Sequence, residues 1–176
     1  INTVMIKGFN DDEIIDLVQL TKNLQVSLRF IEFMPFDGNK WDMKKMVSYA
    51  EIMKKLNSFY SEEQIERLQD APNDTSKNYK IKGYKGSFAV ISSVTNHFCD
   101  TCNRLRLTAN GYLKNCLFSA TESDLLTTLR AGKSIDHINA KAVQAKLKVR
   151  GGMDTLHKFQ ECKLPTQNRS MITIGG

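Results

Sequence analysis

Three cysteines and two arginines lie close together in the stretch "NHFCDTCNRLRLTANGYLKNCLF", residues 96–118. The residues concerned are Cys99, Cys102, Cys116, Arg104 and Arg106. Thiolates are soft metal ligands, and two of them separated by two residues can reach one metal centre from a tight turn. A third thiolate from a neighbouring strand would complete a three-sided cup. The spacing therefore predicts a metal-binding hairpin.

The metal in this hairpin could be zinc or the iron of an iron–sulfur cluster. A closed structural zinc site needs a fourth ligand, which Cys162, His97 or His157 could supply. An iron–sulfur cluster held by three cysteines leaves one iron open to a substrate. Spacing alone does not decide between them. A set of plain buried thiols is the remaining alternative, because cysteine also behaves as a small core hydrophobe.

The turn between the second and third cysteines admits two conformations. A two-residue Asn-Gly turn and a three-residue Ala-Asn-Gly loop with Gly111 left-handed differ by one residue in strand register. The three-residue loop pairs Lys114 with Arg106 across the hairpin. One step further along the ladder it pairs Cys116 with Arg104, which brings thiolates and guanidiniums to one face. We favour this register for that reason.

The two arginines are suited to binding an anion. Arg104 and Arg106 would share one strand face, and their planar guanidiniums fit phosphate oxygens or the acceptor edge of a purine. In the same register Leu105 and Leu107 would face the core. The alternative for the arginines is a solvated strand face, and a neighbouring metal site makes that alternative weaker.

The first part of the chain has the pattern of a βαβ unit. A strand around residues 4–6, a helix after Asn10 or Asp11 as its cap, and a strand in residues 25–34 follow one another. Strands joined by a helix in this way are parallel. Proline, glycine and polar residues then interrupt the pattern, which predicts a domain boundary near residue 36.

The rest of the chain mixes helices with short strands. We expect two strands in residues 79–94 to form a hairpin through the Gly83 to Gly86 turn and to lead into the cysteine motif as part of an antiparallel sheet. Gly132 is expected to end one helix and Ser134 to cap the next. The other expected elements are helices in residues 44–60, 122–132 and 134–149, and a terminal strand in residues 168–176.

Composition places the chain among ordinary globular proteins. It is 41% hydrophobic and 25% charged, and it has no apolar run of the roughly 18 residues that cross a bilayer. The formal net charge of +6 suits an anionic partner, but the basic residues form no block, which disfavours nucleic acid. Clustered cysteines favour a reducing compartment. Because the chain starts with a strand-like "INTVMIKG", we expect it to begin inside a larger protein.

Three stretches together resemble the radical-SAM GTP cyclase family that starts molybdenum cofactor biosynthesis. They are "FCDTCNRLRLTANGYLKNCLF", "RFIEFMPFDGNKW" and the terminal "MITIGG". The resemblance implies an α/β fold in which residues 1–35 are the last βα unit of an incomplete TIM-type barrel. Residues 36–176 would form an α+β domain, whose antiparallel sheet carries a second iron–sulfur cluster and binds GTP.

The resemblance also assigns roles to single residues. It makes the three cysteines of the motif, Cys99, Cys102 and Cys116, the ligands of a second 4Fe-4S cluster whose open iron contacts the guanine. Cys162 is then a bystander. The stretch Arg104, Leu105 and Arg106 would bind GTP.

Two further sites follow from the resemblance alone. Met34 would contact S-adenosylmethionine, although an apolar residue ending a buried strand is an equally good interpretation. Gly175 and Gly176 would form a tail that enters the active site, where the alternative is a frayed terminus. Ser170 departs from the family pattern, since many members have proline there, and this would loosen the tail.

The implied activity is that of a radical-SAM lyase, GTP 3′,8-cyclase. S-adenosylmethionine cleaved at a first 4Fe-4S cluster, in an amino-terminal part outside this chain, would start the conversion of GTP to 3′,8-cyclo-7,8-dihydro-GTP. This chain alone would be inactive, because it has no second cysteine triplet. The rival functions are a zinc-stabilised nucleic-acid-binding module and an iron–sulfur electron carrier.

The family also implies partners and a location. The product would pass to the next pathway enzyme, cyclic pyranopterin monophosphate synthase, and neither nucleic acid nor a membrane would be a partner. The sequence does not decide the oligomeric state, and a homodimer is one alternative. The protein would be cytoplasmic if bacterial and located in the mitochondrial matrix if eukaryotic.

Overall fold

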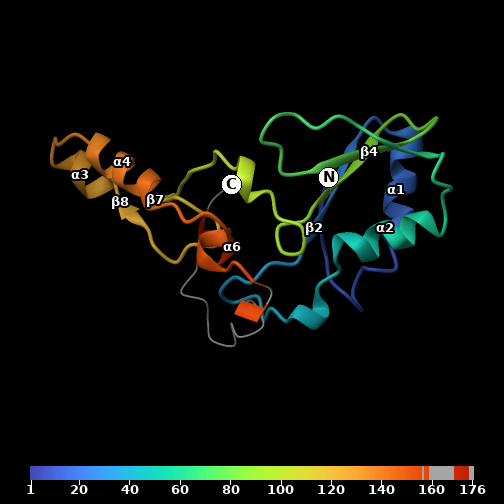
Figure 1. Cartoon of the computed structure of the whole chain (residues 1–176), viewed down its shortest axis with the longest axis horizontal. Coiled ribbons are helices and arrows are strands. Elements are labelled where there is room, and N and C mark those ends of the chain that lie inside the picture. Colours follow the sequence, from blue (N-terminus) through green and yellow to red (C-terminus); the bar gives the residue numbers. More distant parts are fainter. Residues whose placement is uncertain (156, 159–168, 175–176) are drawn as a thin grey trace. The chain divides into compact units, whose positions relative to one another are not determined.

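The computed structural model describes residues 1–155, 157–158 and 169–174, and it divides the chain into two compact units (Figure 1). The first, called here the sheet unit, consists of Ile1–Met34 and Trp41–Phe98. The second, called here the cysteine unit, consists of Pro35–Lys40 and the described residues of Cys99–Gly176. Within the described residues, no helix is both long enough and apolar enough to span a bilayer.

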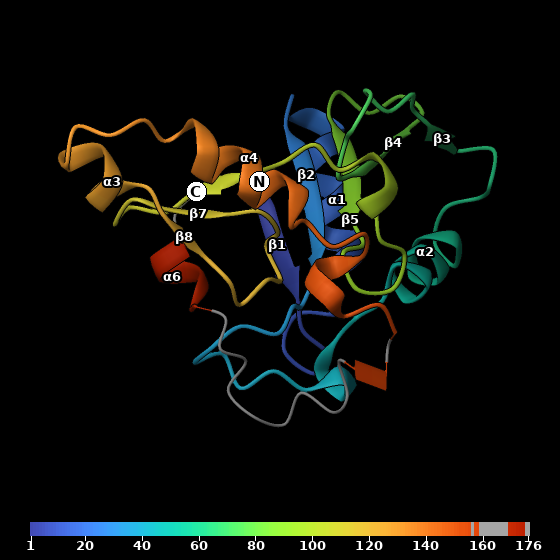
Figure 2. The same cartoon turned by 60° about the vertical axis from the view of Figure 1, so that its left-hand side comes forward.

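The sheet unit contains a five-stranded mixed sheet in the order β1-β2-β5-β4-β3. The β1–β2 and β2–β5 pairs are parallel, and Figure 2 shows these three strands side by side. The β4–β5 and β3–β4 pairs are antiparallel. The strands are β1 (Asn2–Met5), β2 (Ser27–Glu32), β3 (Ile65–Arg67), β4 (Lys77–Ile81) and β5 (Ser87–Ile91).

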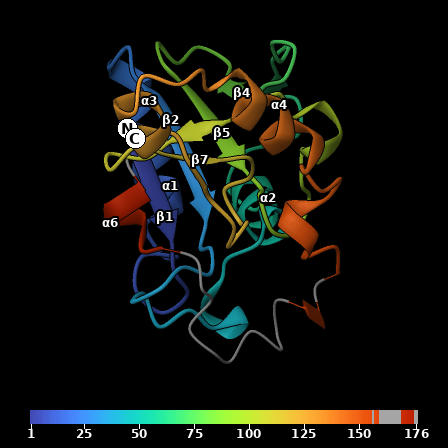
Figure 3. The same cartoon turned by 90° about the vertical axis from the view of Figure 1, so that its left-hand side faces the viewer.

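Two amphipathic helices complete the sheet unit. Helix α1 (Ile14–Asn23) joins the parallel strands β1 and β2, which confirms the predicted βαβ unit. It contacts β2, β5 and helix α2 (Tyr49–Asn57). Figure 3 shows α1 beside the strands β1 and β2. The buried apolar side chains of both helices join those of the strands in one core that includes Val18, Phe30 and Phe88. A single 3-10 turn, η1 (Met43–Lys45), precedes α2.

The predicted cap of helix α1 is wrong. Asn10 and Asp11 do not cap α1; their side chains accept hydrogen bonds from the backbone N–H groups of Ile6 and Gly8 and so stabilise the turn before the helix. Helix α2 has a complete capping box, in which Ser48 and Glu51 satisfy each other's backbone N–H groups. The predicted cap failed because short polar side chains serve a tight turn as well as a helix end.

The predicted hairpin of β4 and β5 is present, but it is not continuous with the cysteine motif. A Cβ atom on Gly86 would lie 2.3 Å from the Val26 carbonyl oxygen, so only glycine fits beside the neighbouring strand. Strand β5 pairs with β2 on its other edge, and the cysteine motif lies in a separate sheet. Strands from both sides of residue 36 therefore share one sheet, and the division into residues 1–35 and 36–176 stays a prediction.

A buried carboxylate connects three parts of the sheet unit. Glu32, at the end of β2, is completely buried. Its oxygens accept hydrogen bonds from the backbone N–H groups of Tyr49 at 3.0 Å, Val94 at 2.8 Å and Thr95 at 2.9 Å. The Thr95 hydroxyl donates a further bond. Glu32 thereby joins β2 to the start of α2 and to the loop after β5.

The cysteine unit contains a three-stranded antiparallel sheet in the order β6-β7-β8. Its strands are β6 (Arg106–Leu107), β7 (Tyr112–Lys114) and β8 (Ser123–Asp124). Its helices are α3 (Leu126–Arg130), α4 (Asp136–Gln144) and α6 (Met171–Ile174), and its 3-10 turns are η2 (Cys99–Thr101) and η3 (Arg150–Gly152). This mixed fold supports the α/β class, with an antiparallel sheet that carries the cysteine motif.

The ends of these helices confirm one prediction and correct two. Gly132 follows the C-cap residue of α3, Ala131, and is left-handed, with φ of 68°; its N–H donates to the Leu129 carbonyl. Ser134 does not cap α4, whose N-cap is Ile135 without a side-chain cap bond; the Ser134 hydroxyl lies one residue earlier and accepts a bond from the N–H of Asp136. The predicted terminal strand is wrong, because residues 171–174 form one helical turn.

Candidate functional site

The hairpin of β6 and β7 positions the motif. Arg106 lies opposite Lys114, and the Thr108 N–H donates to the Tyr112 carbonyl at 2.8 Å. Gly111 is left-handed, with φ of 82°, and its N–H donates to the Thr108 carbonyl at 2.9 Å. These contacts confirm the three-residue loop and its register.

Two predictions about the hairpin are wrong: the extent of its strand pairing and the burial of its two leucines. Strand pairing ends at Arg106 and Lys114, so the predicted pairing of Arg104 with Cys116 is not part of the ladder. Leu105 and Leu107 do not face the core; they are 45% and 63% exposed. Leu107 lies in the edge strand β6 and Leu105 precedes that strand, whereas the residues of the central β7 are buried or half-buried.

The three cysteines lie on the turn before β6 and in the loop after β7. Cys99 begins η2, and the Cys102 N–H donates to its carbonyl at 3.1 Å. All three thiols are free and half-buried. Burial raises the pKa of Cys116, and the nearby Cys99 and Cys102 thiols raise it further, so the three sulfurs interact electrostatically. Among the described residues, no three His, Cys, Asp or Glu side chains are arranged to hold a single metal ion.

Lys146, just after α4, contacts the cysteine loop. Its ammonium group lies 3.5 Å from the Cys102 Sγ and donates to the carbonyl oxygens of Cys102 at 3.2 Å and Arg104 at 2.9 Å. It therefore holds the backbone between the second cysteine and the first arginine. No sequence pattern predicts this contact, because a lysine 44 residues after Cys102 belongs to no local motif.

The backbone of Arg150 contacts another sulfur. Its N–H donates to the Cys99 Sγ at 3.4 Å, and its own conformation is left-handed, with φ of 42°. Such a conformation is uncommon for a residue other than glycine. Arg150 is also 5% exposed, and its guanidinium donates to the Asp154 carbonyl at 2.9 Å. A buried arginine thus closes the loop over the first cysteine.

These donors favour a negatively charged sulfur at Cys102. Burial of the thiol opposes ionisation, but the Arg104 backbone N–H and the Lys146 ammonium outweigh it, and the pKa of Cys102 lies below its usual range. The Arg104 guanidinium also approaches the Cys102 Sγ at 4.0 Å. The first arginine and the second cysteine therefore belong to one local site, in which the sulfur is a potential metal ligand.

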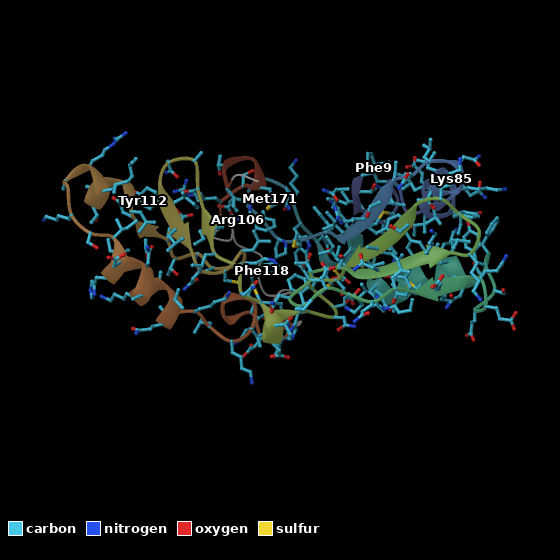
Figure 4. The ribbon with its side chains drawn as sticks, turned by 90° about the horizontal axis from the view of Figure 1, so that it is seen from above. Phe9, Lys85, Arg106, Tyr112, Phe118 and Met171 are labelled. Carbon is cyan, nitrogen blue, oxygen red and sulfur yellow. The ribbon has the colours of Figure 1, made fainter. Side chains whose placement is uncertain are left out.

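Two aromatic rings bring two of the sequence motifs together in the cysteine unit. Phe36, from "RFIEFMPFDGNKW", stacks on Phe118 at the end of the cysteine motif, with ring centroids 6.2 Å apart. Phe36 is 5% exposed and Phe118 is 8% exposed. Figure 4 labels Phe118 together with Arg106 and Tyr112 of the hairpin. The loop after β2 thus packs against the cysteine loop.

The remaining predicted site residues belong to the other unit or lie outside the described part of the chain. Met34 is half-buried and belongs to the sheet unit, two residues after the end of β2. Cys162, Gly175 and Gly176 lie outside the described residues. Their predicted roles stay predictions.

Comparison with known proteins places these motifs in one family. Residues 26–151 match the family described as Molybdenum Cofactor Synthesis C. The chain is 46% identical over 179 residues to "GTP 3′,8-cyclase, mitochondrial" of Arabidopsis thaliana, covering 100% of this chain and 44% of that protein. It is 42% identical to "Molybdenum cofactor biosynthesis protein 1" of Homo sapiens, covering 99% and 26%. It is 37% identical to "GTP 3′,8-cyclase" of Listeria monocytogenes, covering 100% and 53%. The chain therefore spans about half of these relatives or less.

Proposed function

This chain belongs to the Molybdenum Cofactor Synthesis C family, and on that premise we propose that it is the carboxy-terminal part of a GTP 3′,8-cyclase. In this proposal the whole protein converts GTP to 3′,8-cyclo-7,8-dihydro-GTP with S-adenosylmethionine and a first 4Fe-4S cluster, in molybdenum cofactor biosynthesis. Two relatives that match the chain over its full length carry the name of this activity. The observation that carries the proposal is the approach of the Arg104 guanidinium to the Cys102 Sγ at 4.0 Å, in a unit that also holds the free thiols Cys99 and Cys116.

The cysteine loop fits an iron–sulfur cluster. Cys99, Cys102 and Cys116 would hold it, and the Arg150 N–H and the Lys146 ammonium point at two of the sulfurs. Such donors stabilise the negative charge of cluster thiolates. An iron–sulfur cluster can be held by three cysteines, whereas a closed structural zinc site needs a fourth ligand. When bound, the cluster would supply an iron with an open coordination position for the guanine base.

The chain's own residues would bind and orient the nucleotide. Arg104 and Arg106 would grip phosphate oxygens through charge-assisted hydrogen bonds, with Leu105 between them. The Arg104 carbonyl is already held by Lys146, which reduces the ordering that nucleotide binding requires. Met34 and the two terminal glycines complete the proposal as the S-adenosylmethionine contact and the active-site tail.

The proposal extends to partners and location. The product would be passed to cyclic pyranopterin monophosphate synthase, and a homodimer is the oligomeric state to test first. One relative is named as mitochondrial and another is bacterial. We therefore place the protein in the mitochondrial matrix if its source is eukaryotic and in the cytoplasm if it is bacterial.

The arginine pair provides the test of this function. Replacing Arg104 or Arg106 by alanine in the cluster-loaded, full-length enzyme should weaken GTP binding by roughly tenfold to a hundredfold, because each loses one or more charge-assisted hydrogen bonds. Lysine should restore only part of the affinity, since a point charge does not reproduce a planar two-pronged contact. Calorimetric titration of GTP measures the change, and the iron content should stay the same.

Arg130 gives a matched control for this titration. It is an exposed arginine at the end of α3 in the same unit, and its replacement by alanine should leave GTP affinity unchanged. Wild-type affinity in both motif variants would refute GTP binding at this hairpin. An equal loss for inorganic tripolyphosphate, heparin and GTP would point instead to a generic basic surface.

A further inference from the structure

Arg169, directly before the last described helix, contacts three parts of the cysteine hairpin. Its guanidinium donates to the Glu122 carboxylate at 2.6 Å and to the Asn110 side-chain oxygen at 2.9 Å. It also lies over the ring of Tyr112, 5.5 Å from the centroid. One side chain therefore connects the turn, strand β7 and the segment before β8.

The Glu122 carboxylate is shared with a second, buried cation. The Lys114 ammonium lies 3.6 Å from its other oxygen and donates to the Ser119 carbonyl. The Lys114 side chain is fully buried, Glu122 is 12% exposed and Arg169 is 30% exposed. Burial lowers the pKa of Lys114, and Glu122 opposes that shift. Because solvent screens these charges only weakly, the pairs should be stronger than an exposed ion pair.

The short helix that follows Arg169 depends on such contacts. Helix α6 has four residues, and isolated helices of this length do not form in water. Its first turn is closed by the Thr173 N–H, which donates to the Ser170 carbonyl at 2.9 Å. At the other end Ile174 is completely buried. The segment of residues 169–174 is thus fixed at its start by a charge and at its end by an apolar side chain.

We propose that Arg169, Glu122 and Lys114 form a terminal clasp, in which Arg169 is the positioning residue that fixes the carboxy-terminal segment on the hairpin. Ile174, the last described residue, is then held in the unit that also carries Arg106. The clasp deepens the proposed function, on which it rests for the role of the tail in the reaction. Arg169 itself touches neither substrate nor cofactor in this proposal.

Hydrogen exchange of the full-length, cluster-loaded enzyme tests the clasp without using activity. Arg169→Ala should increase amide exchange in peptides covering residues 169–174 by at least about tenfold, because losing the charge-assisted contacts frees the segment. Exchange in the sheet unit should not change. Arg169→Lys should fall between alanine and wild type, since lysine keeps the charge but cannot contact Glu122 and Asn110 together.

Lys158→Ala is the matched control. Lys158 pairs with Asp154 at 2.7 Å in the same unit, but both side chains are about half exposed, at 51% and 55%. Its removal should leave exchange in residues 169–174 unchanged. Unchanged exchange in Arg169→Ala would refute the clasp, whatever the enzyme's activity.

Turnover tests the positioning role separately. Arg169→Ala should lower the kcat for GTP by roughly tenfold while the Kd of GTP and the iron content stay at wild-type values, because only the segment of residues 169–174 loses its attachment. Wild-type turnover together with faster exchange would refute positioning and leave only an attachment. A wild-type enzyme without cyclase activity would refute the proposed function, and the exchange result would still decide whether the clasp exists.

Discussion

Replacing Cys99, Cys102 or Cys116 by serine in the full-length enzyme should remove about four iron and four sulfide ions per chain and abolish GTP cyclisation. Serine is nearly isosteric but is a harder, far weaker ligand for iron than a thiolate. Each cysteine is one of only three protein ligands in the proposed site, so none has a substitute. Iron and sulfide analysis of anaerobically reconstituted protein, with a cyclisation assay, measures both losses.

Cys162 provides the internal control for the cysteine variants. Cys162→Ser should keep the full iron and sulfide content, because the resemblance assigns this residue no ligand role. Loss of iron in Cys162→Ser equal to that in Cys99→Ser would give the site a fourth cysteine and contradict the open iron position. Stoichiometric zinc that survives exposure to air would contradict the cluster itself.

Glu32→Ala should lower the free energy of unfolding of the chain by about 4 kcal/mol. The substitution leaves one buried and two part-buried backbone N–H groups without their acceptor and creates a cavity at the end of β2. Glu32→Gln should cost less, because its amide oxygen can still accept some of these bonds while its NH2 group faces the remaining donors. Urea unfolding followed by circular dichroism measures both changes.

Glu62→Ala is the control for this prediction. Glu62 is an exposed glutamate of the sheet unit, and its removal should change the free energy of unfolding by no more than about 0.5 kcal/mol. Equal stabilities of Glu32→Ala and Glu62→Ala would show that the carboxylate does not hold β2, α2 and the loop after β5 together.

Sequence patterns predicted the structure correctly where residues close together in the chain determine it. Hydrophobic periodicity predicted the βαβ unit, and a glycine that tolerates positive φ predicted the loop at Gly111 and the end of α3 at Gly132. The register of the cysteine hairpin followed from that loop. In each case the determining residues are within a few positions of one another.

The errors and omissions arise from tertiary structure. Leu107 alternates like a core residue, but its strand lies at the edge of a small sheet. Residues 171–174 have the composition of a strand, yet they form a helical turn. Lys146 and Arg169 contact the hairpin from distant positions in the chain, and no local pattern marks such residues.

The loop Pro35–Lys40 belongs to the cysteine unit although strands of the sheet unit precede and follow it in the chain. On the ribosome, Phe36 is synthesised long before Phe118, the ring on which it stacks. The sheet unit is complete once residue 98 has emerged, but Phe36 then still lacks its partner. A nascent chain that stalls before Phe118 would therefore expose Phe36 to chaperones. Because the cysteine unit is built from two stretches of chain, no single proteolytic cut can separate the two units intact.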